Sequence, residues 1–194
     1  MMIICSNPFI AMSEFVLDQP LLDQCLAMNL YDSSTVNDLG TNKIKTSGSR
    51  TSSTYIDQDD SYQAVRLAIL DHINKTYATD YTLYQTELTQ FTKYELGQEY
   101  RPHWDYFNHP SHNAEDNDRV ATAILYLNDD FEGGYTDFPL LNVTIKPVKN
   151  HLLYFTYTDP STRDYTMHAG TPVISGVKQI ITLWIRETNY GIFL

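Results

Sequence analysis

The stretch RVATAILYLND, residues 119–129, decides the fold class, because its apolar and β-branched residues predict a strand. Segments typical of turns lie on both sides of it, namely NHPSHNAEDND (108–118) and EGG (132–134). Further strand-like segments extend from residue 83 to residue 187: LYQTELTQFTKYEL (83–96), QEYRPHWDYF (98–107), NVTIKPV (142–148), HLLYFTY (151–157), YTMHAG (165–170) and KQIITLWIRE (178–187).

Two helices are predicted before this run of strands. The first is expected to begin at Asp18, which can act as an N-cap, and Pro20 then falls in the first turn, where a missing N–H costs little. The second is expected to be capped by Asp60 or Ser61, to carry one apolar stripe and to end near Tyr77.

Residues 37–60 are rich in Ser, Thr, Asn, Gly and Asp, which predicts a long loop broken by a short strand within RTSSTYI (50–56). Two helices followed by many strands favour a mainly β fold, with the helices packed on a two-sheet sandwich or jelly roll. The sequence contains no internal repeat and no linker, so we expect a single domain over residues 1–194.

Composition excludes several functions. The 194 residues include 13 Lys and Arg against 24 Asp and Glu, which gives a formal net charge of −11. Such a surface repels phosphate backbones, so we expect no nucleic-acid partner. No basic residue precedes Lys43 and no run reaches the ~20 apolar residues of a membrane helix, so we expect neither a signal peptide nor a membrane partner. Cys5 and Cys25 are expected to be free thiols in a cytoplasmic protein.

The segment EYRPHWDYF (99–107) places a histidine and an aspartate two residues apart in a strand-like run. His103 and Asp105 are therefore expected on one face of the strand. They form either a hydrogen-bonded structural pair or two thirds of a metal site. His168 supplies a third ligand, and two histidines with one carboxylate form the facial triad of non-haem Fe(II) oxygenases. The residue types alone leave both interpretations open.

Four motifs, in this order, resemble those of the prolyl 4-hydroxylase family of Fe(II)/2-oxoglutarate dioxygenases. They are YELGQEYRPHWDYF (94–107), DRVATAILYLND (118–129), EGGYTDFP (132–139) and HAGTPVISGVKQIITLWIRE (168–187). RTSS (50–53) and the two helices resemble the N-terminal part of the family, so the resemblance extends from Pro8 to Glu187. It implies a double-stranded β-helix, which is a jelly roll of two antiparallel sheets buttressed by N-terminal helices.

The resemblance also implies a catalytic centre. His103, Asp105 and His168 match the iron ligands, and the carboxylate of Asp105 implies hydroxylation, because related halogenases leave that position open for halide. Lys178 matches the residue that anchors the distal carboxylate of 2-oxoglutarate. The physical reason is that a dicarboxylate held by iron at one end needs a cation at the other.

Other positions match family residues around the cosubstrate and the substrate. Tyr94 and Thr136 match hydroxyls of the 2-oxoglutarate pocket. The matches to the peptide groove and its rim are Tyr100, Arg119, Trp184, Glu87 and Ser52. A tyrosine and a tryptophan suit a proline ring, which offers only an apolar, puckered face. The histidines at 109 and 112 are expected to be loop residues that do not bind metal.

The resemblance therefore implies an Fe(II)- and 2-oxoglutarate-dependent hydroxylase that acts on proline in a peptide or protein and releases succinate and CO2. It names ascorbate as a further candidate cofactor. One alternative is the same chemistry on free proline, another side chain or a small metabolite. The other is a metal-binding jelly-roll module without turnover, for which a dicarboxylate pocket would have no use.

Overall fold

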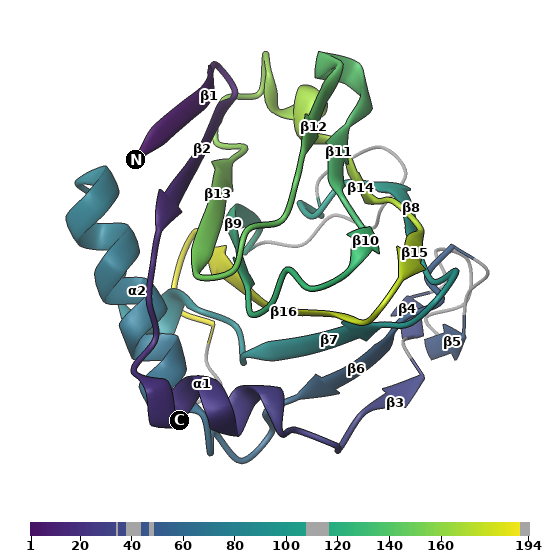
Figure 1. Cartoon of the computed structure of the whole chain (residues 1–194). Helices are drawn as coiled ribbons and strands as arrows, with labels where there is room; N and C mark the ends of the chain where they lie inside the picture. The colour runs from purple at the N-terminus through teal and green to yellow at the C-terminus, as the bar shows by residue number, and fades with distance from the viewer. Residues whose placement is uncertain (34, 38–43, 47–48, 108–116, 191–194) are drawn as a thin grey trace.

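The computed structural model describes residues 1–33, 35–37, 44–46, 49–107 and 117–190 (Figure 1). Two helices are present in these ranges, α1 (Gln19–Leu26) and α2 (Gln63–Tyr77). The strands are β1 (Met2–Ser6), β2 (Phe9–Glu14), β3 (Asp32–Ser33), β4 (Thr35–Asn37), β5 (Ile44–Thr46), β6 (Ser53–Ile56), β7 (Gln90–Tyr94), β8 (Tyr100–His103), β9 (Arg119–Tyr126), β10 (Glu132–Gly133), β11 (Thr136–Phe138), β12 (Val143–Ile145), β13 (His151–Thr156), β14 (His168–Gly170), β15 (Val173–Ser175) and β16 (Lys178–Arg186). Short 3-10 turns cover Leu83–Gln85, Pro139–Leu141 and Arg163–Thr166.

Two antiparallel sheets face each other and form a roll (Figure 1). The larger has eight strands in the order β1-β2-β13-β9-β16-β7-β6-β3, and the smaller has four in the order β12-β11-β14-β8. Two-stranded pairs, β10-β15 and β4-β5, complete the pattern. This is the jelly roll, or double-stranded β-helix, that the sequence predicted, and the fold prediction is confirmed.

The two central strands of the larger sheet separate two apolar layers. On β9, Ala123 and Leu125 belong to the cluster that includes both helices, whereas Ile124 and Tyr126 belong to the cluster between the sheets. β16 alternates in the same way, since Leu183 packs with the helices and the residues before and after it face the inside of the roll. Strand alternation therefore gives the helices one face and the functional cavity the other.

The predicted caps of the helices need correction. Asp18 occupies the N-cap position of α1, but its side chain makes no capping hydrogen bond. The N-cap of α2 is Tyr62, which makes no side-chain capping hydrogen bond, and just before the helix the Asp57 carboxylate accepts hydrogen bonds from the backbone N–H groups of Ser61 (3.0 Å) and Tyr62 (2.7 Å). Asp60 instead forms a 2.7 Å ion pair with the buried Arg66. The chain turns at Asp60 with a φ of 56°, and the sequence carries no direct signal for this turn.

Strand lengths also differ from the prediction. Only the end of segment 83–96 is a strand, β7, because Thr82 and Gln85 form a capping box that starts a 3-10 turn. β1 was not predicted, and it pairs with β2 as a hairpin. The strand within 50–56 is confirmed as β6, although part of loop 37–60 lies outside the described residues.

Two further observations concern the cysteines and the helices. The buried Cys25 and the half-buried Cys5 are both free thiols, as predicted. Neither helix in the described ranges has the length and hydropathy that crossing a bilayer requires.

Candidate metal and cosubstrate site

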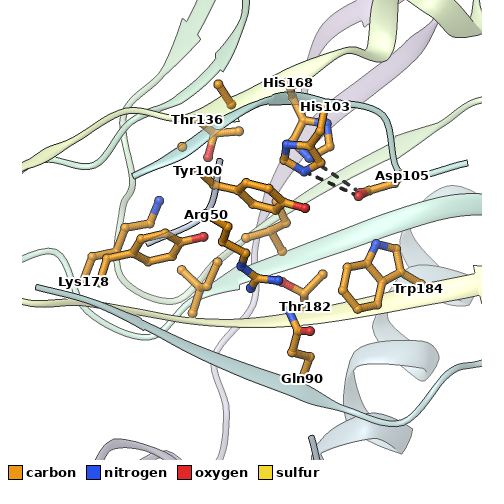
Figure 2. A pocket seen from close by; sticks show the side chains of 15 residues that line it. Arg50, Gln90, Tyr100, His103, Asp105, Thr136, His168, Lys178, Thr182 and Trp184 are labelled. Carbon is orange, nitrogen blue, oxygen red and sulfur yellow. Dashed lines mark ion pairs between the residues drawn. The ribbon is translucent and has the colours of Figure 1, made fainter. Parts of the chain in front are cut away.

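The three predicted metal ligands come together on the smaller sheet. β14 and β8 pair antiparallel, and His168 lies directly opposite His103 in the register. Asp105 follows just after the end of β8, and its carboxylate faces both imidazoles (Figure 2). The Nε2 atom of His103 is 3.7 Å from Asp105 Oδ1, and the Nε2 atom of His168 is 3.6 Å from Oδ2. All the donor atoms lie within 4.8 Å of one another.

Backbone carbonyls fix both histidine rings. The Nδ1 of His103 is 2.8 Å from the carbonyl oxygen of Arg101, and the Nδ1 of His168 is 3.1 Å from that of Thr166. A carbonyl oxygen can only accept, so each Nδ1 carries the proton and donates it. The lone pair of each Nε2 is then directed at the space beside Asp105. This is how histidine is prepared as a metal ligand in proteins.

The protonation states suit a cation. Burial lowers the pKa of His103 to about 3, so its imidazole is neutral at physiological pH. Burial alone would raise the pKa of Asp105, but His168, His103, Arg119 and the Thr122 hydroxyl outweigh it and lower that pKa to about 2. A neutral imidazole and an ionised carboxylate bind a metal without first losing protons.

The geometry fits a divalent metal better than a structural hydrogen-bonded pair. The contacts of 3.6 and 3.7 Å between Nε2 and carboxylate oxygen are too long for hydrogen bonds, and neither Nε2 carries a proton to donate. Two imidazole nitrogens and one carboxylate are the donor set of non-haem Fe(II) sites. The residues present therefore fit an iron ion.

The triad lines one part of a cavity, of about 430 Å³ including its open mouth, between the two sheets. Lys178 lies away from the triad in the same cavity (Figure 2). Its side chain is almost fully buried, and its Nζ donates a 2.7 Å hydrogen bond to the carbonyl oxygen of Gly134. Gly134 adopts a φ of 61°, which favours glycine at this turn. No acidic side chain among the described residues pairs with Lys178.

The two predicted cosubstrate hydroxyls also lie in this cavity. Tyr94 and Thr136 line it, and the ring of Tyr94 is 5.2 Å from the Lys178 Nζ. The Thr136 hydroxyl is 2.8 Å from that of Tyr126. Burial lowers the pKa of Lys178 to about 7, which is the cost of holding an ammonium group without a counter-charge. A dicarboxylate would supply that charge.

The residues predicted to contact the substrate divide into two groups. Tyr100 and Trp184 line the cavity, and the Tyr100 ring stacks on that of His103 at 3.6 Å. Arg119, Glu87 and Ser52 do not line it. Arg119 lies over the Trp184 ring at 4.0 Å, and both Arg119 and Arg186 form ion pairs with Glu87 at 2.6 Å. Ser52 accepts a 3.0 Å hydrogen bond from Arg50.

Several cavity residues were missed by the sequence analysis, notably Arg50, Gln90 and Thr182. Arg50 is buried, donates to Ser52 and Thr92, and lies over the Tyr100 ring at 4.7 Å. Strand alternation could have identified Thr182, because every second residue of β16 from Lys178 to Trp184 faces the cavity. The histidines at 109 and 112 lie outside the described residues, so the expectation about them stays a prediction.

Comparison with known proteins agrees with this geometry. A family model described as the 2OG-Fe(II) oxygenase superfamily matches residues 89–186. "Probable prolyl 4-hydroxylase 3" of Arabidopsis thaliana is 35% identical over 184 residues, which cover 82% of this chain and 62% of that protein. "Probable prolyl 4-hydroxylase 9" of the same plant is 31% identical over 193 residues, which cover 86% of this chain and 66% of that protein. The chain thus spans slightly less than two thirds of each relative.

Solved structures share the fold. A viral collagen prolyl hydroxylase from Paramecium Bursaria Chlorella virus-1, in a 2OG complex, superposes with a TM-score of 0.66 at 27% identity and covers 95% of this chain and 99% of that chain. A prolyl hydroxylase from Trichoplax adhaerens gives a TM-score of 0.69 at 18% identity, covering 93% of this chain and 84% of that chain. The chain belongs to the 2OG-Fe(II) oxygenase superfamily.

Proposed function

We propose that this chain is an Fe(II)- and 2-oxoglutarate-dependent dioxygenase that hydroxylates proline within a peptide or protein. The observation that carries the proposal is a single cavity that holds the His103, Asp105 and His168 triad together with the buried Lys178. The similarity to proteins named as prolyl 4-hydroxylases supports the choice of substrate. The viral relative with bound 2-oxoglutarate supports the choice of cosubstrate.

Each part of the cavity has a proposed role. The triad holds the metal, and Lys178 holds the distal carboxylate of 2-oxoglutarate with help from the Tyr94 and Thr136 hydroxyls. When bound, iron and 2-oxoglutarate would activate dioxygen: one of its oxygen atoms enters a C–H bond of the substrate, and the other enters 2-oxoglutarate, which is oxidised and decarboxylated to succinate and CO2. Ile124 and Ile180 contribute apolar side chains to the lining of this cavity.

The proposed substrate contacts are Tyr100 and Trp184, whose rings line the cavity near the triad (Figure 2). Arg119 lies behind Trp184, and its Nη1 also donates to the Asp105 carbonyl oxygen at 3.3 Å. We therefore propose that Arg119 and Glu87 fix the position of the Trp184 side chain, and that Ser52 fixes the position of Arg50. The apolar faces of the two rings suit the pyrrolidine ring of proline.

We further propose that residues 1–194 act as one domain in the cytoplasm. The pairing of strands from β1 to β16 in one eight-stranded sheet supports the single domain, and the free thiols of Cys5 and Cys25 support a reducing compartment. A requirement for ascorbate stays a prediction.

The proposal is tested by incubating the protein with Fe(II), 2-oxoglutarate and a library of proline-rich peptides. We expect succinate release and a mass increase of one oxygen atom on proline. Succinate without peptide oxidation would favour free proline, another side chain or a small metabolite as substrate. Tight iron binding without any succinate would instead favour a metal-binding module.

Replacing Trp184 by alanine should reduce peptide hydroxylation sharply, because an aromatic wall of a binding site often contributes about 2 kcal/mol or more. Trp184→Phe, which keeps an aromatic ring, should lose much less. Binding of iron and 2-oxoglutarate, measured by titration, should stay near that of the unmodified protein. Thermal melts are the control, since a variant that melts far earlier and loses cosubstrate binding would make Trp184 a structural residue.

The affinity for 2-oxoglutarate should fall as pH rises above about 7. Below its pKa of about 7 Lys178 is charged, whereas above it the lysine is neutral and must take up a proton before it can pair with the dianion. The loss should approach tenfold per pH unit, and calorimetry in buffers of different ionisation enthalpy should detect proton uptake. In Lys178→Met the affinity should be weak and nearly independent of pH in this range. An equal pH dependence in both proteins would assign the effect to another group.

A further inference from the structure

Asp105 faces two histidines and accepts a hydrogen bond from a third side chain. Its Oδ2 accepts a 2.7 Å hydrogen bond from the Thr122 hydroxyl, in addition to facing His168. Its Oδ1 faces the Nε2 of His103 at 3.7 Å. The two oxygens of the carboxylate are therefore not equivalent, because only one has a hydrogen bond from the protein within the described residues.

Thr122 is placed rigidly. It lies in β9, fully buried, and pairs with Phe155 of β13 on one side and with Trp184 of β16 on the other. A strand bonded on both edges moves little, and the β-branched side chain of threonine has few rotamers. The hydroxyl is thus a fixed point against which the carboxylate of Asp105 can be oriented.

The direction of the hydrogen bond between Thr122 and Asp105 follows from the partners of the Thr122 hydroxyl. The hydroxyl of Tyr157 is 3.1 Å from Thr122 Oγ1. An ionised carboxylate can only accept, so Thr122 donates its one proton to Asp105 and must accept from Tyr157. Burial raises the pKa of Tyr157 well above its ordinary value, which keeps the phenol protonated as a donor. The resulting chain runs from Tyr157 to Thr122 to Asp105, and such chains strengthen each member.

Tyr157 is itself anchored. Its side chain is almost fully buried, and its backbone N–H donates to the carbonyl oxygen of Val120 at 3.1 Å. Its ring packs against that of Tyr106, the residue after Asp105, with the centroids 5.6 Å apart. Tyr157, the first donor of the chain, is therefore fixed by β9 and by the residue that follows Asp105.

We propose that Thr122, which accepts a hydrogen bond from Tyr157, is a positioning residue. Its hydrogen bond to Asp105 Oδ2 keeps that oxygen from coordinating the metal and leaves Oδ1 as the coordinating oxygen. The carboxylate then occupies a single coordination position. This leaves room on an octahedral ion for a chelating 2-oxo acid and dioxygen. The proposal rests on the proposed iron site, and its test separates the two.

The decisive measurement is anaerobic titration of the whole protein with Fe(II) or Co(II), without 2-oxoglutarate. Removing a group that hydrogen-bonds a ligand typically lowers metal affinity by about 10- to 100-fold, so we expect that loss in Thr122→Val. Thr122→Ser, which restores the hydroxyl, should recover most of the affinity. Tyr157→Phe, which removes only the outer donor, should lose less than Thr122→Val.

A second measurement addresses coordination directly. If the freed Oδ2 of Thr122→Val also reaches the metal, the affinity of the metal-loaded variant for 2-oxoglutarate should fall although Lys178 is unchanged. Thr89→Val is the matched control, because Thr89 is fully buried, does not line the cavity, and its hydroxyl has no hydrogen-bond partner in the described part of the chain. It should match the unmodified protein in both measurements.

The outcomes are distinguishable. Failure of the unmodified protein to bind a divalent metal would overturn the proposed function and this inference with it. Metal binding by Thr122→Val equal to that of the unmodified protein would overturn the inference alone. If Thr122→Val does not fold, Thr122→Ser and Tyr157→Phe decide. A folded serine variant with weak metal binding, or a phenylalanine variant with unchanged binding, would then refute the donor chain.

Discussion

Single alanine substitutions at His103, Asp105 and His168 should each abolish succinate production and weaken Fe(II) binding. Each side chain offers one of the donor atoms that lie within 4.8 Å of one another, and no other such cluster of His, Cys, Asp and Glu occurs among the described residues. Metal assistance is worth several kcal/mol, so the expected loss of turnover is on the order of a thousandfold or more. Succinate release and anaerobic metal titration measure the two effects.

His151→Ala is the matched control for this prediction. The Nδ1 of His151 is 3.1 Å from the carbonyl oxygen of Lys149, which is the same local contact that the two proposed ligands His103 and His168 make. No carboxylate among the described residues forms an ion pair with it. Metal binding should therefore be unchanged. A triad variant that binds iron and turns over normally would show that the ligands are assigned wrongly.

Replacing Lys178 by alanine should lower the affinity for 2-oxoglutarate by about ten- to a hundredfold. A hydrogen bond to a charged group contributes about 1.5–3 kcal/mol, and each ~1.4 kcal/mol changes a dissociation constant tenfold. Metal binding should persist, because Lys178 contacts none of the three proposed ligands in the described structure. Calorimetric titration with 2-oxoglutarate and Mn(II) measures the effect without turnover.

Removing the ammonium group of Lys178 has a second expected consequence. In the absence of 2-oxoglutarate the buried ammonium group has no counter-charge, so Lys178→Met should melt at a higher temperature than the unmodified protein. Lys93→Ala is a suitable control, because Lys93 on the neighbouring strand β7 pairs with Glu95 instead of lining the cavity. Unchanged affinity for 2-oxoglutarate in Lys178→Ala would shift the anchor to Arg50, the other buried cation of the cavity.

The local part of the site could be read from the sequence. His103 and Asp105 are two residues apart and were expected on one face of a strand, but β8 ends at His103, and Asp105 reaches the same site from just beyond the strand. Lys178 and Trp184 were predicted from the family resemblance, and strand alternation, which puts both on one face of β16, would have added Ile180 and Thr182. The order of the strand-like segments was therefore sufficient to predict the jelly roll, and the motif resemblance was needed to propose the metal and cosubstrate residues.

The long-range pairings could not be read in this way. Glu87 joins Arg119 and Arg186, and Arg50 reaches the cavity from the segment before β6, although nothing in their local sequence names these partners. The N-cap of α2 was misassigned for a similar reason, since the turn at Asp60 places Tyr62 at the start of the helix and the Asp57 carboxylate just before it. Such contacts form between segments that are distant in sequence, so they depend on how the strands and helices pack together.

The sequence by itself determined the residue types that the chemistry needs, the strand faces on which they lie, and the order of strands along the chain. Only the tertiary structure decided that His168 lies opposite His103, that Thr122 meets the carboxylate of Asp105, and that Lys178 is buried without an acid beside it. The physical reason is that side-chain periodicity is a local property of the backbone. Hydrogen bonds, ion pairs and burial arise only when strands distant in sequence are packed against each other.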